Sequence, residues 1–136
     1  MKTYSHLFFD LDRTLWDFES NSYEALSDIF EKYVLKNHFS DPRDFIDTYH
    51  KHNEKLWAQY RHGTLKKDIL RSKRFELTLN ERDVRDPVMA QQIGDDYLEL
   101  SVIKTRLFPY TRDILEYLRP KYKLYILTNG FKETQF

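Results

Sequence analysis

The chain has 136 residues and a mass of 16.7 kDa, and 40% of its residues are hydrophobic. This size and composition suit one domain, or a small domain with an insertion, and exclude a disordered or collagen-like chain. Lys and Arg together number 22, as do Asp and Glu, so no net charge attracts nucleic acid or an acidic membrane. The absence of cysteine excludes disulfides and thiolate metal sites, whereas a metal held by oxygen ligands stays compatible with the sequence.

The apolar residues do not form a run close to the length of about 20 residues that a membrane span needs. Residues 1–4 lead directly into a strand-like segment, without the pattern of a signal peptide. We therefore expect a cytoplasmic protein with no membrane partner.

Two short apolar runs, at residues 5–10 and 122–128, have the pattern of strands buried in a parallel sheet. A short helical stretch that ends before Pro120 precedes the second run. Each run is followed by small polar residues, which is where ligands bind in open α/β sheets. The sequence predicts an α/β protein with a candidate site at the carboxyl ends of these two strands.

Four helical segments are predicted between the two strands, each with apolar residues spaced three and four apart. Their expected starts are marked by side chains that can cap a helix: Ser20 or Asn21, then Asp41, Thr64 and Asp86. Such helices can bury their apolar stripes against one another. We therefore expect residues 17–105 to form a four-helix bundle that acts as a cap domain. This bundle would be inserted into a core made of residues 1–16 and 106–136.

The segment Asp10-Leu11-Asp12-Arg13-Thr14 follows the first predicted strand. Residues two apart in an extended backbone point to the same side, so Asp10 and Asp12 can present two carboxylates to one crevice. One carboxylate can attack phosphorus while the second moves protons, and a hard cation such as Mg²⁺ would offset their repulsion of a phosphate. Taken alone, the segment also suits a turn in which Asp12 caps the backbone and Thr14 bonds locally.

Thr128, Asn129 and Gly130 follow the second predicted strand and precede a helical segment. The threonine hydroxyl and the backbone N–H groups at this turn can meet an anion. The alternative is an ordinary strand-to-helix turn, in which Asn-Gly supplies backbone freedom.

Residues 7–15, Leu-Phe-Phe-Asp-Leu-Asp-Arg-Thr-Leu, resemble the first motif of the haloacid dehalogenase-like (HAD) superfamily. Residues 126–130, Ile-Leu-Thr-Asn-Gly, resemble its second motif. The helical segment between them is similar to the subgroup with a helical cap, and residues 57–63 and 74–76 are most similar to pyrimidine 5′-nucleotidases. The resemblance implies a partial Rossmann-like core, comprising the first two parallel strands, with an inserted helical cap.

The resemblance also implies a role for each matching residue. Asp10 would attack phosphorus to form an aspartyl-phosphate, and Asp12 would act as general acid and then as general base. Asp10 and the backbone carbonyl of Asp12 would bind Mg²⁺, and Thr128, Asn129 and Gly130 would bind the phosphate. Because dehalogenases of the superfamily lack an acid at the second position, Asp12 favours phosphate chemistry.

The sequence departs from the family pattern in two respects. Arg13 stands where many relatives have glycine, although the nucleotidase-like subgroup tolerates a larger residue. The third motif, which carries a lysine, and the fourth, which carries acids for the metal, normally follow the second, but only six residues follow Gly130. The sequence therefore resembles the amino-terminal portion of such a protein, and we expect little activity from these 136 residues alone.

Arg61, His62 and Arg74 in the helical insertion are candidate cap contacts to a substrate. The predicted function is Mg²⁺-dependent hydrolysis of a small phosphorylated metabolite, with a nucleoside 5′-monophosphate preferred and no nucleic acid polymer as partner. One alternative is another small substrate, such as a sugar phosphate or phosphoglycolate. The other is an inactive binding or assembly fragment, which could cover its exposed sheet edge by forming a homodimer.

Overall fold

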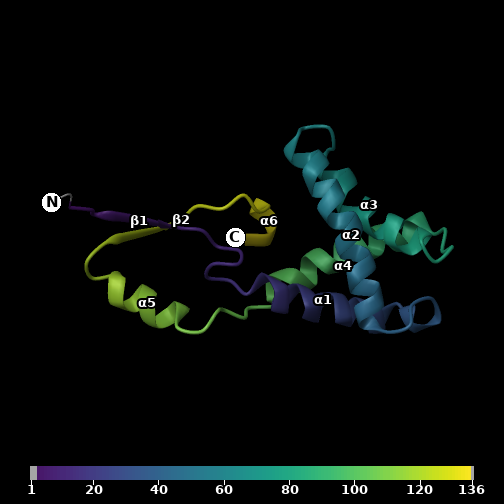
Figure 1. Cartoon of the computed structure of the whole chain (residues 1–136), viewed down its shortest axis with the longest axis horizontal. Helices are drawn as coiled ribbons and strands as arrows, with labels where there is room; N and C mark the ends of the chain where they lie inside the picture. The colour runs from purple at the N-terminus through teal and green to yellow at the C-terminus, as the bar shows by residue number, and fades with distance from the viewer. Residues whose placement is uncertain (1–2, 136) are drawn as a thin grey trace. The chain divides into compact units, whose positions relative to one another are not determined.

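The computed structural model describes residues 3–135 (Figure 1). The chain divides into two compact units, one made of residues 1–22 and 102–136 and the other of residues 23–101. This division lies within six residues of the domain boundaries expected at 16/17 and 105/106, which stay a prediction. Among the described residues, no helix combines the length and the apolar character needed to cross a membrane.

The first unit contains a two-stranded parallel sheet, as the sequence predicts (Figure 1). Strand β1 (His6–Phe9) pairs with β2 (Lys123–Ile126), and the register sets Phe9 opposite Ile126. The pairing continues for one more residue, because the Leu127 N–H donates to the Phe9 carbonyl at 2.8 Å. The carboxyl ends of the two strands therefore lie side by side. Helix α5 (Thr111–Leu118) precedes β2, and the short helix α6 (Lys132–Gln135) follows it.

One face of this sheet carries exposed aromatic side chains. Phe8 is 65% exposed and Tyr125 is 42% exposed, and their rings stack with centroids 5.0 Å apart. Such a cross-strand aromatic pair stabilises strand pairing by about 0.2–1 kcal/mol. This face nevertheless exposes apolar side chains to water, whereas parallel sheets normally have both faces covered.

The second unit contains most of a four-helix arrangement, which confirms the expected helical insertion (Figure 1). The helices are α1 (Phe18–Lys32), α2 (Pro42–Arg61), α3 (Lys67–Asn80) and α4 (Pro87–Ile103), with a 3₁₀ turn η1 (Leu35–Asn37) after α1. One continuous cluster of buried side chains forms the core of this unit: Ala25, Leu26, Ile29, Phe30, Leu35, Phe39, Phe45, Ile46, Tyr49, Phe75, Leu79, Ala90, Ile93 and Tyr97.

Helix α2 begins as the sequence predicts. Asp41 is its N-cap, and the Asp41 carboxylate accepts a hydrogen bond from the Asp44 N–H at 2.9 Å. Pro42 occupies the first helical turn, where its missing N–H has no partner to lose.

Helices α1 and α3 begin differently from the prediction. The Asp17 carboxylate, rather than Ser20 or Asn21, accepts the bonds at the start of α1, from the Ser20 N–H (3.1 Å) and hydroxyl (2.7 Å). These bonds also lower the pKa of Asp17 below its usual range. Thr64 does not cap α3, which begins at Lys67, because the Thr64 hydroxyl donates to the Gln59 carbonyl instead.

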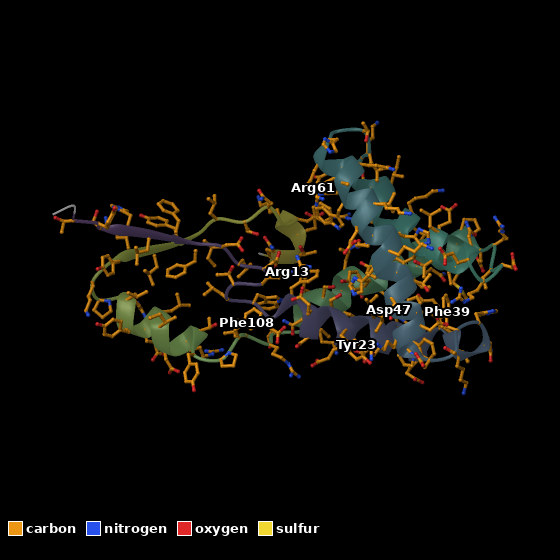
Figure 2. All side chains as sticks on the ribbon, in the orientation of Figure 1. Arg13, Tyr23, Phe39, Asp47, Arg61 and Phe108 are labelled. Carbon is orange, nitrogen blue, oxygen red and sulfur yellow. The ribbon has the colours of Figure 1, made fainter. Side chains whose placement is uncertain are left out.

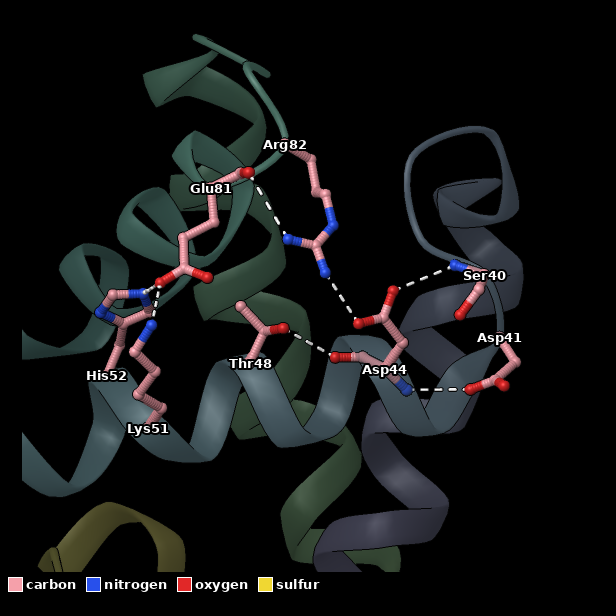
Figure 3. Close-up of polar contacts among 8 residues, drawn as sticks. All are labelled: Ser40, Asp41, Asp44, Thr48, Lys51, His52, Glu81 and Arg82. Carbon is pink, nitrogen blue, oxygen red and sulfur yellow. Dashed lines mark hydrogen bonds and ion pairs between the residues drawn. The ribbon is translucent and has the colours of Figure 1, made fainter.

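Charged side chains join α2 to the turn after α3 (Figure 3). Lys51 Nζ and His52 Nε2 both contact Glu81 Oε1, at 2.6 and 2.8 Å, and Arg82 Nη2 lies 2.7 Å from Asp44 Oδ1. The bonds from Lys51 and then from His52 lower the pKa of Glu81 below its usual range. His52 thus contacts Glu81 within the helical unit.

Candidate active site

Asp10 is the first residue after β1, and its side chain has a fixed hydrogen-bond donor. The Thr14 hydroxyl donates to Asp10 Oδ2 at 2.8 Å. The intervening loop folds tightly because the Leu11 carbonyl accepts the N–H groups of Thr14, Leu15 and Trp16 at 2.9–3.2 Å. The loop thus returns the threonine to the aspartate and leaves Oδ1 of Asp10 without a bond from Thr14.

Asp12 lies in the same loop and is partly buried. Burial raises the pKa of its carboxyl above the usual range, and the negative charge of Asp10 adds to the increase. An acid whose pKa is raised holds its proton closer to neutral pH, which suits a group that must donate and then accept a proton. The two carboxylates of the Asp-x-Asp segment therefore differ in chemistry.

Arg13, the residue directly after Asp12, adopts a left-handed backbone conformation with φ = 65°. Glycine adopts this conformation without the steric cost that a residue with a side chain incurs. The Arg13 guanidinium pairs with Glu19 and lies 4.7 Å from the centre of the Phe18 ring. Arg13 is thus bound to the first turn of α1, and its charge partly counteracts the increase in the Asp12 pKa.

Thr128, Asn129 and Gly130 follow β2 beside the Asp10 loop. The Gly130 N–H donates to the Thr128 hydroxyl oxygen at 3.2 Å, which leaves the hydroxyl hydrogen able to donate to another group. Gly63 is the glycine with a positive φ among the described residues, so Gly130 does not use the left-handed freedom that an Asn-Gly turn offers.

A side-chain hydrogen bond joins the two loops that follow the strands. Gln135 Nε2, in α6, donates to Asp12 Oδ2 at 3.1 Å across 123 residues of sequence. Gln135 was not among the site residues predicted from the sequence. A signal was present, because Phe131, directly before α6, is apolar and lies four residues before Gln135, a spacing that brings two side chains to the same side of a helical turn. Phe131 is indeed buried.

The candidate cap residues differ in their surroundings. Arg61, the last residue of α2, is exposed (Figure 2). The following residue, His62, is exposed as well. Arg74, in α3, is only 4% exposed. The structure therefore leaves Arg61 and His62 accessible within the helical unit and buries Arg74 inside it.

The buried Arg74 guanidinium joins three helices of this unit. Its Nη1 donates to the Tyr49 hydroxyl at 3.0 Å and to Asn53 Oδ1 at 3.2 Å, both on α2. Its guanidinium carbon lies 4.9 Å from the centre of the Tyr97 ring on α4. Burial raises the pKa of the Tyr49 hydroxyl, which keeps it neutral beside the arginine. These contacts give Arg74 a structural role in the helical unit.

The donors available for a metal at the candidate site are hard oxygen atoms. The Asp10 carboxylate and the Asp12 backbone carbonyl are of the type that Mg²⁺ prefers. Within residues 3–135, no three His, Asp or Glu side chains are grouped so that they could hold a metal ion. The described residues thus fit Mg²⁺ in chemical type but supply only part of a coordination shell.

The fold and this loop geometry place the chain in a defined class. A family model for haloacid dehalogenase-like hydrolases matches residues 4–135, so the chain belongs to that family. The chain is 29% identical over 137 residues to the HAD-hydrolase YfnB of Bacillus subtilis. The match covers 100% of this chain and 55% of YfnB. The chain thus spans about half the length of that relative.

Solved structures agree with this assignment. The crystal structure of YfnB bound to magnesium matches with a TM-score of 0.84 and 27% identity, covering 98% of this chain and 56% of that one. A 2-haloacid dehalogenase from Pseudomonas syringae matches with a TM-score of 0.55 and 22% identity, covering 94% of this chain and 56% of that one. The second comparison shows a shared fold alone.

Proposed function

We propose that the protein containing this chain is a Mg²⁺-dependent phosphomonoester hydrolase that acts through an aspartyl-phosphate. The observation that carries the proposal is the pair of unlike acids after β1, where Asp10 bonds to Thr14 and Asp12 has a raised pKa. Family membership supports hydrolysis, and the position of Thr128 beside this loop supplies a donor for a phosphoryl oxygen.

The proposed reaction has two displacements at phosphorus. Asp10 Oδ1 attacks the phosphorus, the bond to the ester oxygen breaks, and Asp12 donates a proton to the leaving alkoxide. Asp12 then takes a proton from water, whose oxygen attacks the same phosphorus, and the bond between phosphorus and Asp10 breaks. Inorganic phosphate leaves, and both carboxyl groups return to their starting protonation states.

The residues proposed to hold Mg²⁺ are Asp10, through its carboxylate, and Asp12, through its backbone carbonyl. When bound, the ion supplies positive charge that offsets the repulsion between the phosphate and the carboxylates. Support comes from the hard oxygen donors of this loop and from magnesium in the YfnB structure. Residues of a longer protein would complete the Mg²⁺ coordination shell and would supply the lysine expected near the phosphate.

The proposed substrate is a nucleoside 5′-monophosphate. Residues 57–63 and 74–76 are most similar to pyrimidine 5′-nucleotidases, and Arg61 and His62 are exposed side chains in that region. Arg74 is the weakest of the three candidate contacts, because its guanidinium already bonds to Tyr49 and Asn53. A sugar phosphate or phosphoglycolate is the alternative substrate, which the same two carboxylates would hydrolyse.

Phosphate release by a longer protein that contains this chain tests the proposal, with a panel of nucleotides, sugar phosphates and phosphoglycolate. Asp10→Asn should abolish release with every substrate and Asp12→Asn should reduce it strongly, whereas the exposed Asp47→Asn on α2 serves as the matched control. Unchanged turnover in Asp10→Asn would refute the nucleophile assignment. Turnover that does not depend on Mg²⁺ would refute the assigned cofactor.

A further inference from the structure

Gln135, in the helix α6 that follows β2, contacts Asp12 in the loop that follows β1. Its Nε2 donates to Asp12 Oδ2 at 3.1 Å, so the loop after β1 and the helix after β2 share one side-chain bond. When Asp12 is ionised this bond has a charged acceptor, and such bonds are shorter and stronger than bonds between neutral groups.

Gly130 provides the space through which the Gln135 side chain passes. A Cβ atom built on Gly130 would lie 2.0 Å from Gln135 Nε2, 2.4 Å from Cδ and 2.7 Å from Oε1. All three distances are shorter than van der Waals contact, so a Cβ atom at this position would force the Gln135 amide, the far end of a flexible side chain, to move. Because Gly130 has no positive φ, its backbone conformation does not require glycine, and the position of the Gln135 amide is what a side chain at residue 130 would disturb.

The orientation of the Gln135 amide is fixed by Asp12. Gln135 Oε1 is buried and has no hydrogen-bond partner among residues 3–135. Exchanging the two ends of the amide would place Oε1 against the Asp12 carboxylate, where two acceptors would face each other. In this arrangement the amide oxygen Oε1 has no hydrogen-bond partner among residues 3–135, while Nε2 bonds to Asp12.

We propose that Gln135 is a positioning residue, whose amide, seated over Gly130, holds the Asp12 carboxylate in one rotamer for proton transfer at the candidate site. Proton transfer needs a heavy-atom distance close to that of a hydrogen bond, so a carboxylate that changes rotamer spends time out of reach. The inference rests on the proposed function for its chemical meaning, and the conformational claim is tested separately from turnover.

Three-bond couplings between Asp12 Cγ and its backbone nitrogen and carbonyl carbon report the χ1 angle, and NMR measures them in this 136-residue chain. The wild type should give couplings of one staggered rotamer. Gln135→Met, which keeps the length but removes the amide, should give the averaged couplings of several rotamers. Gly130→Ala should do the same without altering Gln135, because the new methyl group displaces the amide.

The control is Gln92→Met, the same chemical change at an exposed position on α4. Its Asp12 couplings should equal those of the wild type. The Leu127 N–H, which bonds across the sheet, reports whether each variant remains folded, and Gln135→Met and Gly130→Ala provide two independent disruptions.

Averaged couplings in both folded variants would support the inference. It would be overturned by averaged couplings in the wild type, or by a single rotamer that persists in either folded variant. Phosphate release by Asp12→Asn tests only the proposed function. An active enzyme in which the Asp12 side chain changes rotamer would refute the positioning role of Gln135 but not the proposed function.

Discussion

Asn21 and Arg106, which are 85 residues apart in sequence, exchange two hydrogen bonds. Asn21 Nδ2 donates to the Arg106 carbonyl at 2.9 Å, and the Arg106 N–H donates to Asn21 Oδ1 at 2.9 Å. The same carbonyl accepts the Asp17 N–H at 3.1 Å. The asparagine side chain, which is 4% exposed, thus pairs with a backbone peptide as a neighbouring strand would. This pairing joins the start of α1 to the segment after α4.

We expect Asn21→Ala to destabilise the unit that contains the sheet by about 2 kcal/mol, because two bonds to a backbone peptide are lost. This free energy corresponds to roughly 30-fold faster hydrogen exchange of a backbone amide that exchanges through unfolding of the unit. The Leu127 N–H, which bonds to Phe9, is a suitable probe. The exposed Asn37→Ala is the control, and equal exchange in the two variants would contradict the structural role of Asn21.

The Glu81 cluster predicts a pH-dependent contribution to stability. Because Lys51 and His52 lower the pKa of Glu81 in the folded chain, its stabilisation is present above the unfolded pKa of about 4.3 and is lost as pH falls through the folded pKa. Glu81→Gln should therefore lower the free energy of unfolding at pH 7, by at most about 1 kcal/mol because the pair is partly exposed. The difference from the wild type should shrink toward zero in acid.

Urea unfolding of Glu81→Gln and the wild type at neutral and acidic pH measures this dependence. Glu54→Gln, at an exposed position of α2, removes the same charge without removing that ion pair. A difference between Glu81→Gln and the wild type that stays constant across the pH range would show that the carboxylate does not stabilise the fold through Lys51 and His52.

Arg74→Met should destabilise the helical unit by about 3 kcal/mol. The methionine keeps a long apolar stem but removes the charged donor to the buried Tyr49 hydroxyl and to Asn53 Oδ1, which then accepts only from the Tyr49 hydroxyl. Urea unfolding followed by far-UV circular dichroism measures the loss, and Arg43→Met at an exposed position of α2 is the control. Unaltered stability together with a raised KM would instead favour a contact between Arg74 and substrate.

Thr14→Val should lower kcat by about tenfold in an active protein that contains this chain, because Asp10 loses the donor that fixes Oδ2. Thr14→Ser retains the hydroxyl and should stay close to the wild type. Steady-state phosphate release provides the comparison. Equal rates in the valine and serine variants would show that the hydroxyl does not position Asp10.

The helix starts show how far local sequence specifies the fold. Asp41 caps α2 as predicted, because the proline that follows it suits the first helical turn and so marks the preceding residue as the cap. At α1 three neighbouring residues, Asp17, Ser20 and Asn21, all have side chains able to cap. The choice among them depends on Arg106, which occupies the Asn21 side chain from 85 residues away. Local propensity does not contain that contact.

The candidate site shows the same division between local and distant information. Asp10, Asp12 and Thr128 could be selected because they follow recognisable strands, and the register brings the two strand ends together. The contact between Gln135 and Asp12 could not be read from either loop alone, since it spans 123 residues. The burial of Arg74 was equally hidden, because a charged residue on a helix is normally exposed.

Every member of the buried cluster that forms the helical core lies between Ala25 and Tyr97, within a single unit. This unit therefore has its own hydrophobic core, and it lies in the sequence between the two motifs. Under the proposed function, substitutions on its surface would change which molecules the protein selects without altering the residues proposed for chemistry. Diversity among relatives is accordingly expected to accumulate on that surface, while the two strand ends change slowly.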